Sequence, residues 1–91
     1  MALTFEWDAE KFDQNLRKHG IGFEEAASVF SDPLSLTIPD PDHSAEEERW
    51  VLLGISDAAR LLVVVHAEGG DTIRLISARL ATRVERNRYE A

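Results

Sequence analysis

Arginine is concentrated near the end of the chain, where it could bind phosphate. Residues 72–91 hold five arginines against two acidic residues, a net charge of +3. Residues 1–71 hold five lysines and arginines against fifteen acidic residues, a net charge of −10. The guanidinium group is planar and donates paired hydrogen bonds that suit phosphate oxygens. An acidic chain that gathers positive charge in one segment therefore indicates an anionic partner for that segment.

The spacing of these arginines predicts a stripe on a helix. We expect the last helix to begin near Arg79 and to end by Glu90. On such a helix Arg79, Arg83 and Arg86 are spaced i, i+4 and i+7, which places them on one side. The alternative interpretation is a solvated face that Glu85 and Glu90 partly neutralise. The apolar side chains that would dock this helix on a sheet are Leu80, Ala81 and Val84.

Two further polar residues lie in strands that are otherwise apolar. Arg74 could contact phosphate beside Arg79, or it could pair with one of the many acidic residues, because an arginine in such a strand needs a polar partner. His66 ends the most apolar strand and could serve as a general acid or base near neutral pH. The alternative for His66 is a structural role with a hydrogen-bonded ring.

An acidic loop is the one cluster whose residue types suit a metal ion. Its oxygen ligands could hold Mg²⁺ or Ca²⁺. However, the loop lacks the spacing of an EF-hand and a glycine at the tight turn, so we expect a solvated loop and no metal. The loop residues with ligand side chains are Asp40, Asp42, His43, Glu46, Glu47 and Glu48.

Composition excludes several other classes of protein. The chain has no cysteine, so neither disulfides nor thiolate metal sites are available. It has no P-loop, glycine-rich dinucleotide turn, serine nucleophile elbow or HExxH motif, and we expect no cofactor. It also shows no signal peptide and no membrane span, so we expect a cytoplasmic protein. The net charge of −7 argues against indiscriminate nucleic-acid binding.

The periodicity of the 91 residues predicts a single α+β domain, residues 1–91. Asp8 is expected to cap a helix that reaches about His19 and stops at Gly20. Three strands joined by short turns should form an antiparallel meander, with one earlier strand as a fourth member and helices before and after. The expected strands span residues 3–7, 34–38, 49–55, 60–66 and 72–78, and a second short helix spans residues 23–30.

Motifs spread along almost the whole chain match one family pattern in order. The opening part has Phe5-Glu6-Trp7-Asp8, Lys11, Asn15, Lys18-His19-Gly20, Phe23-Glu24-Glu25-Ala26 and Val29-Phe30-Ser31-Asp32-Pro33. The middle has Asp42-His43-Ser44, Glu48-Arg49 and Gly54. The end has Ile76-Ser77-Ala78-Arg79, Ala81, Glu85-Arg86 and Tyr89-Glu90. In this set and order, the chain resembles the BrnT family.

The resemblance implies a bacterial type II toxin with a RelE-like fold and ribonuclease activity. It also implies a partner, a BrnA-like antitoxin with a ribbon-helix-helix DNA-binding domain, so that operator DNA is contacted only through the antitoxin. The chain departs from the family pattern at Leu80, where a basic residue is common, and at Ala67-Glu68, where Thr and often an aromatic residue follow the histidine.

Our hypothesis is that the chain cleaves RNA without a metal, by attack of the 2′-hydroxyl on the adjacent phosphate. The candidates for stabilising the developing charge are Arg74, Arg79 and Arg83. The candidates for acid or base are His66 and then Glu48, which lies beside Arg49. The candidates for holding the RNA are Lys11, Lys18 and Arg86. Two alternatives remain: an inactive binding protein that acts with the antitoxin as a co-repressor, and a metal-dependent nuclease that uses the loop at 40–48.

Overall fold

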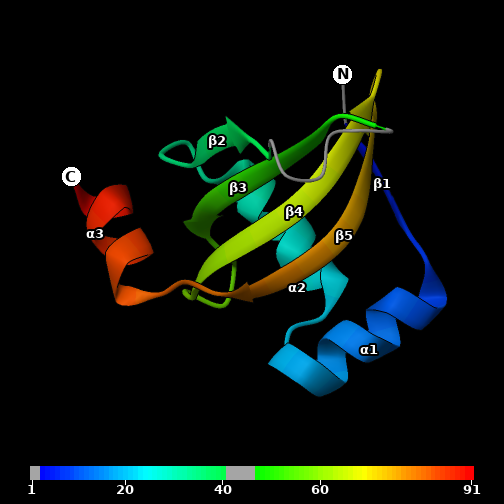
Figure 1. Cartoon of the computed structure of the whole chain (residues 1–91), viewed down its shortest axis with the longest axis horizontal. Coiled ribbons are helices and arrows are strands. Elements are labelled where there is room, and N and C mark those ends of the chain that lie inside the picture. Colours follow the sequence, from blue (N-terminus) through cyan, green and yellow to red (C-terminus); the bar gives the residue numbers. More distant parts are fainter. Residues whose placement is uncertain (1–2, 41–46) are drawn as a thin grey trace.

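Five strands form one sheet in the computed structural model, which describes residues 3–40 and 47–91. The elements are β1 (Thr4–Trp7), α1 (Ala9–His19), α2 (Phe23–Ser28), η1 (Val29–Ser31), β2 (Leu36–Pro39), β3 (Arg49–Ile55), β4 (Leu61–Gly69), β5 (Thr72–Leu80) and α3 (Arg83–Glu90). The strands lie in the order β1-β5-β4-β3-β2 (Figure 1). The predicted meander is confirmed as β3, β4 and β5, and β2 pairs antiparallel with β3 as its fourth strand.

The sheet is mixed, so the expectation of a purely antiparallel sheet is wrong. Strand β1 pairs parallel with β5, from Thr4 opposite Thr72 to Trp7 opposite Leu75. Parallel neighbours need a long connection rather than a tight hairpin. The chain supplies one, because the helices α1 and α2 and the strands β2, β3 and β4 separate β1 from β5. No helix in the described part of the chain is long and apolar enough to span a membrane.

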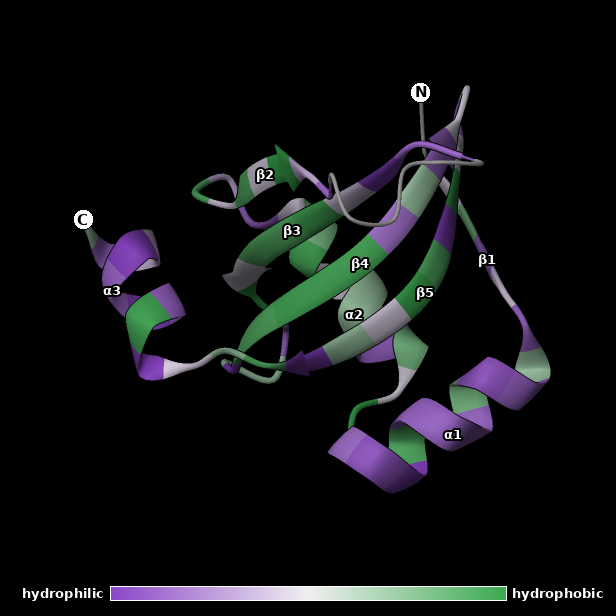
Figure 2. Ribbon diagram, viewed as in Figure 1, coloured by the Kyte–Doolittle hydropathy of each residue, from purple (hydrophilic) through white to green (hydrophobic). Residues whose placement is uncertain are grey.

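One face of the sheet carries the main core. Helix α2 lies behind the sheet in Figure 1, and apolar residues are concentrated in β3 and β4 in Figure 2. From the sheet, Leu62, Val64 and Leu75 are at most 1% exposed and pack with Phe23 of α2. Burial of each such side chain contributes roughly 1.5–3 kcal/mol. We call the opposite face of the sheet, which α1 and α2 do not cover, the open face.

Helix α1 has the ends that the sequence predicts. The Asp8 carboxylate accepts hydrogen bonds from the backbone N–H groups of Glu10 at 2.9 Å and Lys11 at 3.1 Å. Gly20 has φ 71°, the left-handed conformation that ends a helix, and its N–H donates to the carbonyl oxygen of Leu16. Both capping predictions are confirmed.

The last helix begins four residues later than expected, and the predicted stripe of three arginines on one helix is wrong. Arg79 lies in β5, opposite Val63 of β4, and Arg83 is the first residue of α3. The physical reason is a capping box: the Thr82 hydroxyl accepts the N–H of Glu85, and the Glu85 carboxylate accepts the N–H of Thr82. Pairing with β4 continues to Leu80, which lies opposite Leu62. The expected docking side chain Val84 is 76% exposed.

Helix α3 is held against the sheet by its far end. The Tyr89 hydroxyl donates a 2.6 Å hydrogen bond to Asp32, whose carboxylate also accepts the N–H of Ile55 at 2.8 Å. These hydrogen bonds lower the pKa of Asp32, the one from Ile55 most. Tyr89 and Ala81 also pack against a second cluster of buried residues on the open face, Leu53, Leu61 and Val63. The same Asp32 therefore joins η1, β3 and α3.

Candidate functional site

A β-bulge in β5 decides which side chains reach the open face. Val65 of β4 lies opposite Ser77, but the next residue, His66, lies opposite Leu75, so Ile76 has no partner in β4. An extra residue reverses the alternation of side chains beyond it. Arg74 and Arg79 would point to opposite faces of a regular strand, because their separation is odd. The bulge places both on the open face, and we call this pair the β5 arginines.

Arg74 meets a second arginine and a carboxylate at one end of the open face. Arg49 of β3 and Arg74 of β5 both lie beside Ala67 of β4, which separates them. The Glu47 carboxylate accepts hydrogen bonds from Arg74 Nη2 and, at 3.4 Å, from Arg49 Nε. The hydrogen bond from Arg74 is the main reason that the pKa of Glu47 is lowered. Three charged groups therefore converge on a half-exposed surface.

Arg79 is paired with a carboxylate of α3. Its Nη1 and Nη2 atoms lie 2.8 Å from the two carboxylate oxygens of Glu85, a bidentate ion pair. The hydrogen bond from Arg79 is the largest cause that lowers the Glu85 pKa to about 2. The Arg79 side chain is still 41% exposed. The sequence alternative, in which Glu85 partly neutralises the arginines, therefore holds for Arg79.

Asn15 fixes the β5 segment that carries these side chains. Its amide oxygen accepts the N–H of Ala78 at 3.0 Å, and its Nδ2 donates to the carbonyl oxygens of Ala78 and Ile21 at 2.9 Å each. Strand β1 pairs with residues 72–75, and no other strand in the part of the chain that the structure describes lies beside Ala78 on that side. The Asn15 side chain, which is 6% exposed, makes the hydrogen bonds that a neighbouring strand would otherwise make with Ala78.

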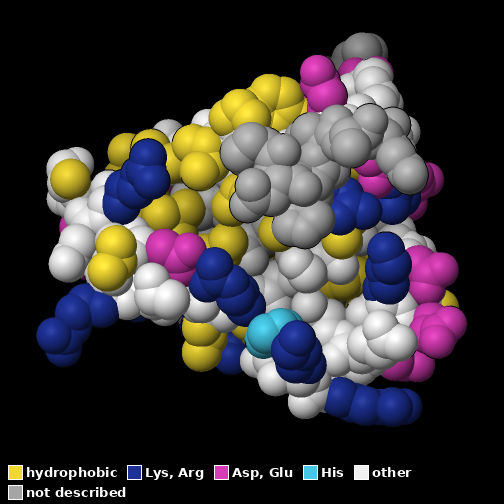
Figure 3. All heavy atoms as spheres, in the orientation of Figure 1, with side chains coloured by type: hydrophobic (Ala, Val, Ile, Leu, Met, Phe, Trp, Pro, Cys, Tyr) yellow, Lys and Arg dark blue, Asp and Glu magenta, His cyan; other side chains and the backbone are white. Residues whose placement is uncertain are grey.

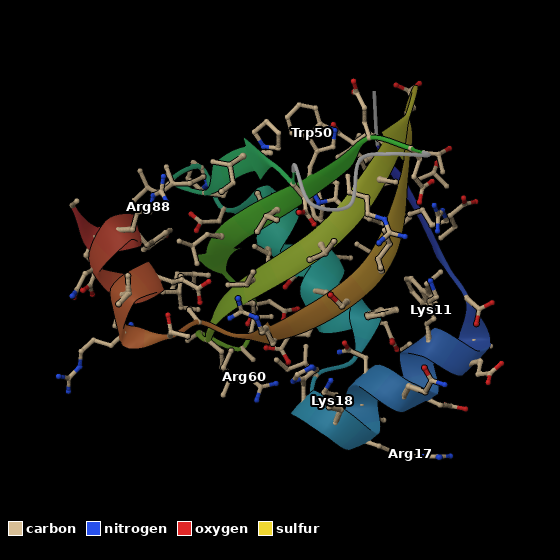
Figure 4. All side chains as sticks on the ribbon, in the orientation of Figure 1. Lys11, Arg17, Lys18, Trp50, Arg60 and Arg88 are labelled. Atoms are coloured by element: carbon tan, nitrogen blue, oxygen red, sulfur yellow. The ribbon has the colours of Figure 1, made fainter. Side chains whose placement is uncertain are left out.

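A basic groove runs between α1 and β5. Its volume is about 220 Å³, and Lys11, Lys18 and His19 line it together with Ile76 and Ser77. Figure 4 shows both lysines on α1, and Figure 3 shows lysine and arginine side chains over β5 and α1 on the same view of the molecule. The two predicted RNA-binding lysines therefore lie beside the bulge that positions the β5 arginines.

His66 lies on the other face from the β5 arginines. Its ring packs edge-on against Phe30 with centroids 4.8 Å apart, and it is 1% exposed. Burial lowers the pKa of His66, although Glu68, 3.9 Å from Nε2, opposes the shift. Nδ1 has no hydrogen-bond partner in the described structure. His66 was a candidate acid or base for the chemistry at the arginines, but it does not share a surface with them. Residue 66 belongs to the alternate set of β4 side chains, which faces the core.

The other predicted residues are dispersed. Glu48 is exposed just before β3, and Arg83 and Arg86 are exposed on α3. Within residues 3–40 and 47–91, no group of three or more histidine, aspartate or glutamate side chains could hold a metal ion. Asp42, His43 and Glu46 of the expected acidic loop, and the motif Asp42-His43-Ser44, lie outside the described residues.

Sequence reasoning missed the structural partners of the site. Glu47, rather than Glu48, contacts Arg49 and Arg74. The sequence pattern that could have predicted the contact with Arg49 is the i, i+2 spacing, which places both side chains on one side of an extended chain. The sequence pattern T-x-x-E at Thr82 and Glu85 also predicts the capping box. Nothing in one sequence marks Asn15 as a substitute for a strand.

Comparisons with known proteins identify the family and the fold. A family model described as the ribonuclease toxin BrnT of type II toxin–antitoxin systems matches residues 7–85. The crystal structure of the Brucella abortus ribonuclease toxin BrnT superposes with a TM-score of 0.70 and 22% identity, over 90% of this chain and 100% of that chain. This likeness shows a shared fold. No curated protein sequence matches the chain. The chain belongs to the BrnT family of ribonuclease toxins, whose type II systems pair a toxin with an antitoxin.

Proposed function

We propose that this chain is a toxin that cleaves RNA without a metal ion, by attack of a 2′-hydroxyl on the adjacent phosphate. The observation that carries the proposal is the bulge at Ile76, which brings Arg74 and Arg79 to one face with Arg49 nearby. Cations fixed where charge develops in a transition state are often the largest contribution to catalysis. The three arginines supply such cations on a face that α1 and α2 leave open.

The proposed reaction forms one bond and breaks one bond. The 2′-oxygen bonds to phosphorus, and the bond from phosphorus to the 5′-oxygen breaks, which leaves a 2′,3′-cyclic phosphate and a 5′-hydroxyl. Arg74 and Arg79 bind the phosphorane oxygens. A phosphate that binds Arg74 displaces Glu47, whose freed carboxylate takes the 2′-hydroxyl proton, with Glu48 as the neighbouring alternative. The leaving 5′-oxygen takes a proton from water.

The basic groove supports binding of the RNA backbone on one side of the arginines. Lys11 and Lys18 are exposed there, and Arg83 and Arg86 are exposed on α3 at the other side. Phosphate contacts of this kind hold a strand without reading its sequence. In this proposal His66 has a structural role, since it is buried behind the sheet. The proposal also includes a RelE-like fold and a BrnA-like ribbon-helix-helix antitoxin that contacts operator DNA.

Cleavage of a defined RNA tests this proposal. The purified chain is incubated with a single-stranded RNA, and with the same sequence carrying 2′-deoxyribose throughout, each with and without EDTA. We expect cleavage of the RNA alone, unaffected by EDTA, with 2′,3′-cyclic phosphate ends. Cleavage that EDTA abolishes supports the metal-dependent alternative, and cleavage of the deoxy strand contradicts 2′-hydroxyl attack.

One observation favours a second candidate function. Arg74 and Arg79 each pair with a carboxylate, Glu47 and Glu85, so the two charges are already compensated. A chain in this state could bind its antitoxin and act only as a co-repressor on operator DNA. Absence of cleavage, together with tight antitoxin binding and tighter operator binding by the complex, supports this second function over the first.

A further inference from the structure

An apolar groove crosses the open face between α3 and the edge strand β2. Its volume is about 70 Å³. A water molecule needs roughly 10–15 Å³ measured in this way, so the groove has room for the end of an aliphatic side chain. The groove is lined by Leu36, Ile38, Val51, Leu53 and Val63, with Glu85 and Arg88 of α3 at its border.

The strand register explains why these side chains meet. Leu36 lies opposite Leu53, and Ile38 lies opposite Val51, so β2 and β3 present both pairs on one face. Leu36 is 40% and Ile38 43% exposed, although both are aliphatic. Figure 3 shows hydrophobic side chains gathered over β2 and β3. An exposed apolar patch with a polar border indicates a binding surface for another molecule.

The charge beside the groove defines the kind of molecule. Arg83, Arg86 and Arg88 are exposed on α3 and make no ion pair with any side chain in the described ranges. Arg60 and Arg79, in contrast, pair with Glu25 and Glu85. Arg88 borders the groove, and together with Arg83 and Arg86 it makes α3 a basic helix. A basic helix beside an apolar groove complements a partner that carries acidic side chains beside aliphatic ones.

We propose that this groove binds a segment of the antitoxin in which aliphatic side chains lie next to aspartate or glutamate. This inference rests on the proposed function, and it adds the surface and chemistry of the antitoxin contact. Val63 lines the groove and is the cross-strand neighbour of Arg79. Glu85 borders the groove and pairs with Arg79. An occupant therefore lies beside the β5 arginines and keeps RNA away from them.

Binding to the purified antitoxin of the same toxin–antitoxin pair tests the apolar part. We expect Ile38→Asp to weaken the affinity at least about 30-fold, because a charge would be buried at the centre of the contact. The matched control is Leu34→Asp. Leu34 is 71% exposed just before β2 and does not line the groove, so its change should alter affinity less than about threefold. If Ile38→Asp does not fold by circular dichroism, Ile38→Thr replaces it, with a smaller expected loss.

Association rates test the charged part. We expect Arg88→Glu to slow association with the antitoxin by roughly tenfold at low salt, and this difference should shrink as salt is added. The control is Arg17→Glu, which reverses an exposed arginine on α1 that points away from the sheet (Figure 4). A larger effect from Arg17→Glu than from Arg88→Glu would overturn the proposed surface.

Binding and cleavage are measured separately, so failure of this inference is distinct from failure of the proposed function. Unchanged affinity in Ile38→Asp overturns the antitoxin site, whether or not the chain cleaves RNA. If the same variant instead converts a dimer of the free chain to a monomer, the groove belongs to a second copy of this chain. If the unaltered chain does not cleave RNA but Ile38→Asp still weakens antitoxin binding, the result supports the antitoxin site and contradicts only the enzymatic proposal.

Discussion

The covered face and the open face of the sheet come from the same strands but differ in burial and charge. On the covered face, Leu62, Val64 and Leu75 are at most 1% exposed and pack under the helices. On the open face, Leu36 and Ile38 remain 40% and 43% exposed, and arginines pair with carboxylates. Stability is therefore concentrated on one face, which leaves the other free to carry charge and exposed apolar surface.

A truncation on each face gives the largest expected contrast. Leu62→Ala removes a fully buried side chain and should lower the free energy of unfolding by about 3 kcal/mol. Ile38→Ala removes a side chain that is 43% exposed and should cost less than about 1 kcal/mol. Urea denaturation of the two variants measures both values. Equal losses would contradict the assignment of stability to the covered face.

Asn15→Ala should have the next largest effect. Asn15 takes the place of a strand neighbour for Ala78 of β5, and β5 carries side chains of both faces. The change leaves the N–H and carbonyl of Ala78 without their partner, and an unsatisfied buried group costs about 1–3 kcal/mol. We expect a loss of about 2 kcal/mol in the free energy of unfolding, measured by urea denaturation. Gln14→Ala, on the exposed neighbour, is the control and should change stability by less than about 0.5 kcal/mol.

The pH dependence of the covered face should come from His66. Its pKa is lowered by burial from the ordinary 6.5, so the fold favours the neutral ring. This contribution to stability is present above pH 6.5 and is lost as the pH falls below it, by about 1.4 kcal/mol per unit of pKa shift at most. Thermal denaturation between pH 5 and roughly pH 8 should show this loss in the unaltered chain and in His19→Gln, but not in His66→Phe. Retention of the slope in His66→Phe would assign it to another group.

The open face should contribute a pH dependence of stability that lies at lower pH and is smaller than that of His66. The pKa of Glu85 is lowered from 4.5 to about 2 by Arg79, so its contribution is present above pH 4.5 and is lost as the pH falls toward 2. The pair is partly exposed, and solvent screening limits its value to about 1 kcal/mol. The difference in unfolding free energy between the unaltered chain and Glu85→Gln should therefore shrink from pH 5 to pH 3. A constant difference would mean that the glutamine acts through the helix cap alone.

The features that the sequence predicted correctly depend on local signals. Asp8 and Gly20 mark the ends of α1 by their own chemistry, and alternating apolar residues placed the meander. Family motifs spread along the chain indicate the BrnT family, and the family match over residues 7–85 confirms this.

The errors arose where distant contacts decide the structure. Arg79 fits a helical stripe by spacing alone, but pairing with β4 holds it in a strand. One bulge residue, Ile76, decides the face of both β5 arginines, and no local pattern marks it. His66 ends a strand in sequence, yet its contact with Phe30 from η1 decides its burial. The residue types of the candidate site could thus be proposed from the sequence, but their arrangement in space could not.

The central claim is that arginines on the open face stabilise charge during RNA cleavage. The most direct test is the single-turnover rate of RNA cleavage by Arg79→Ala and by Glu85→Gln. Both variants break the same ion pair, but only the first removes the cation. We predict a fall of about 10²–10³-fold for Arg79→Ala and a rate at or above that of the unaltered chain for Glu85→Gln. Equal losses in both variants, or unchanged cleavage by Arg79→Ala, would contradict the claim.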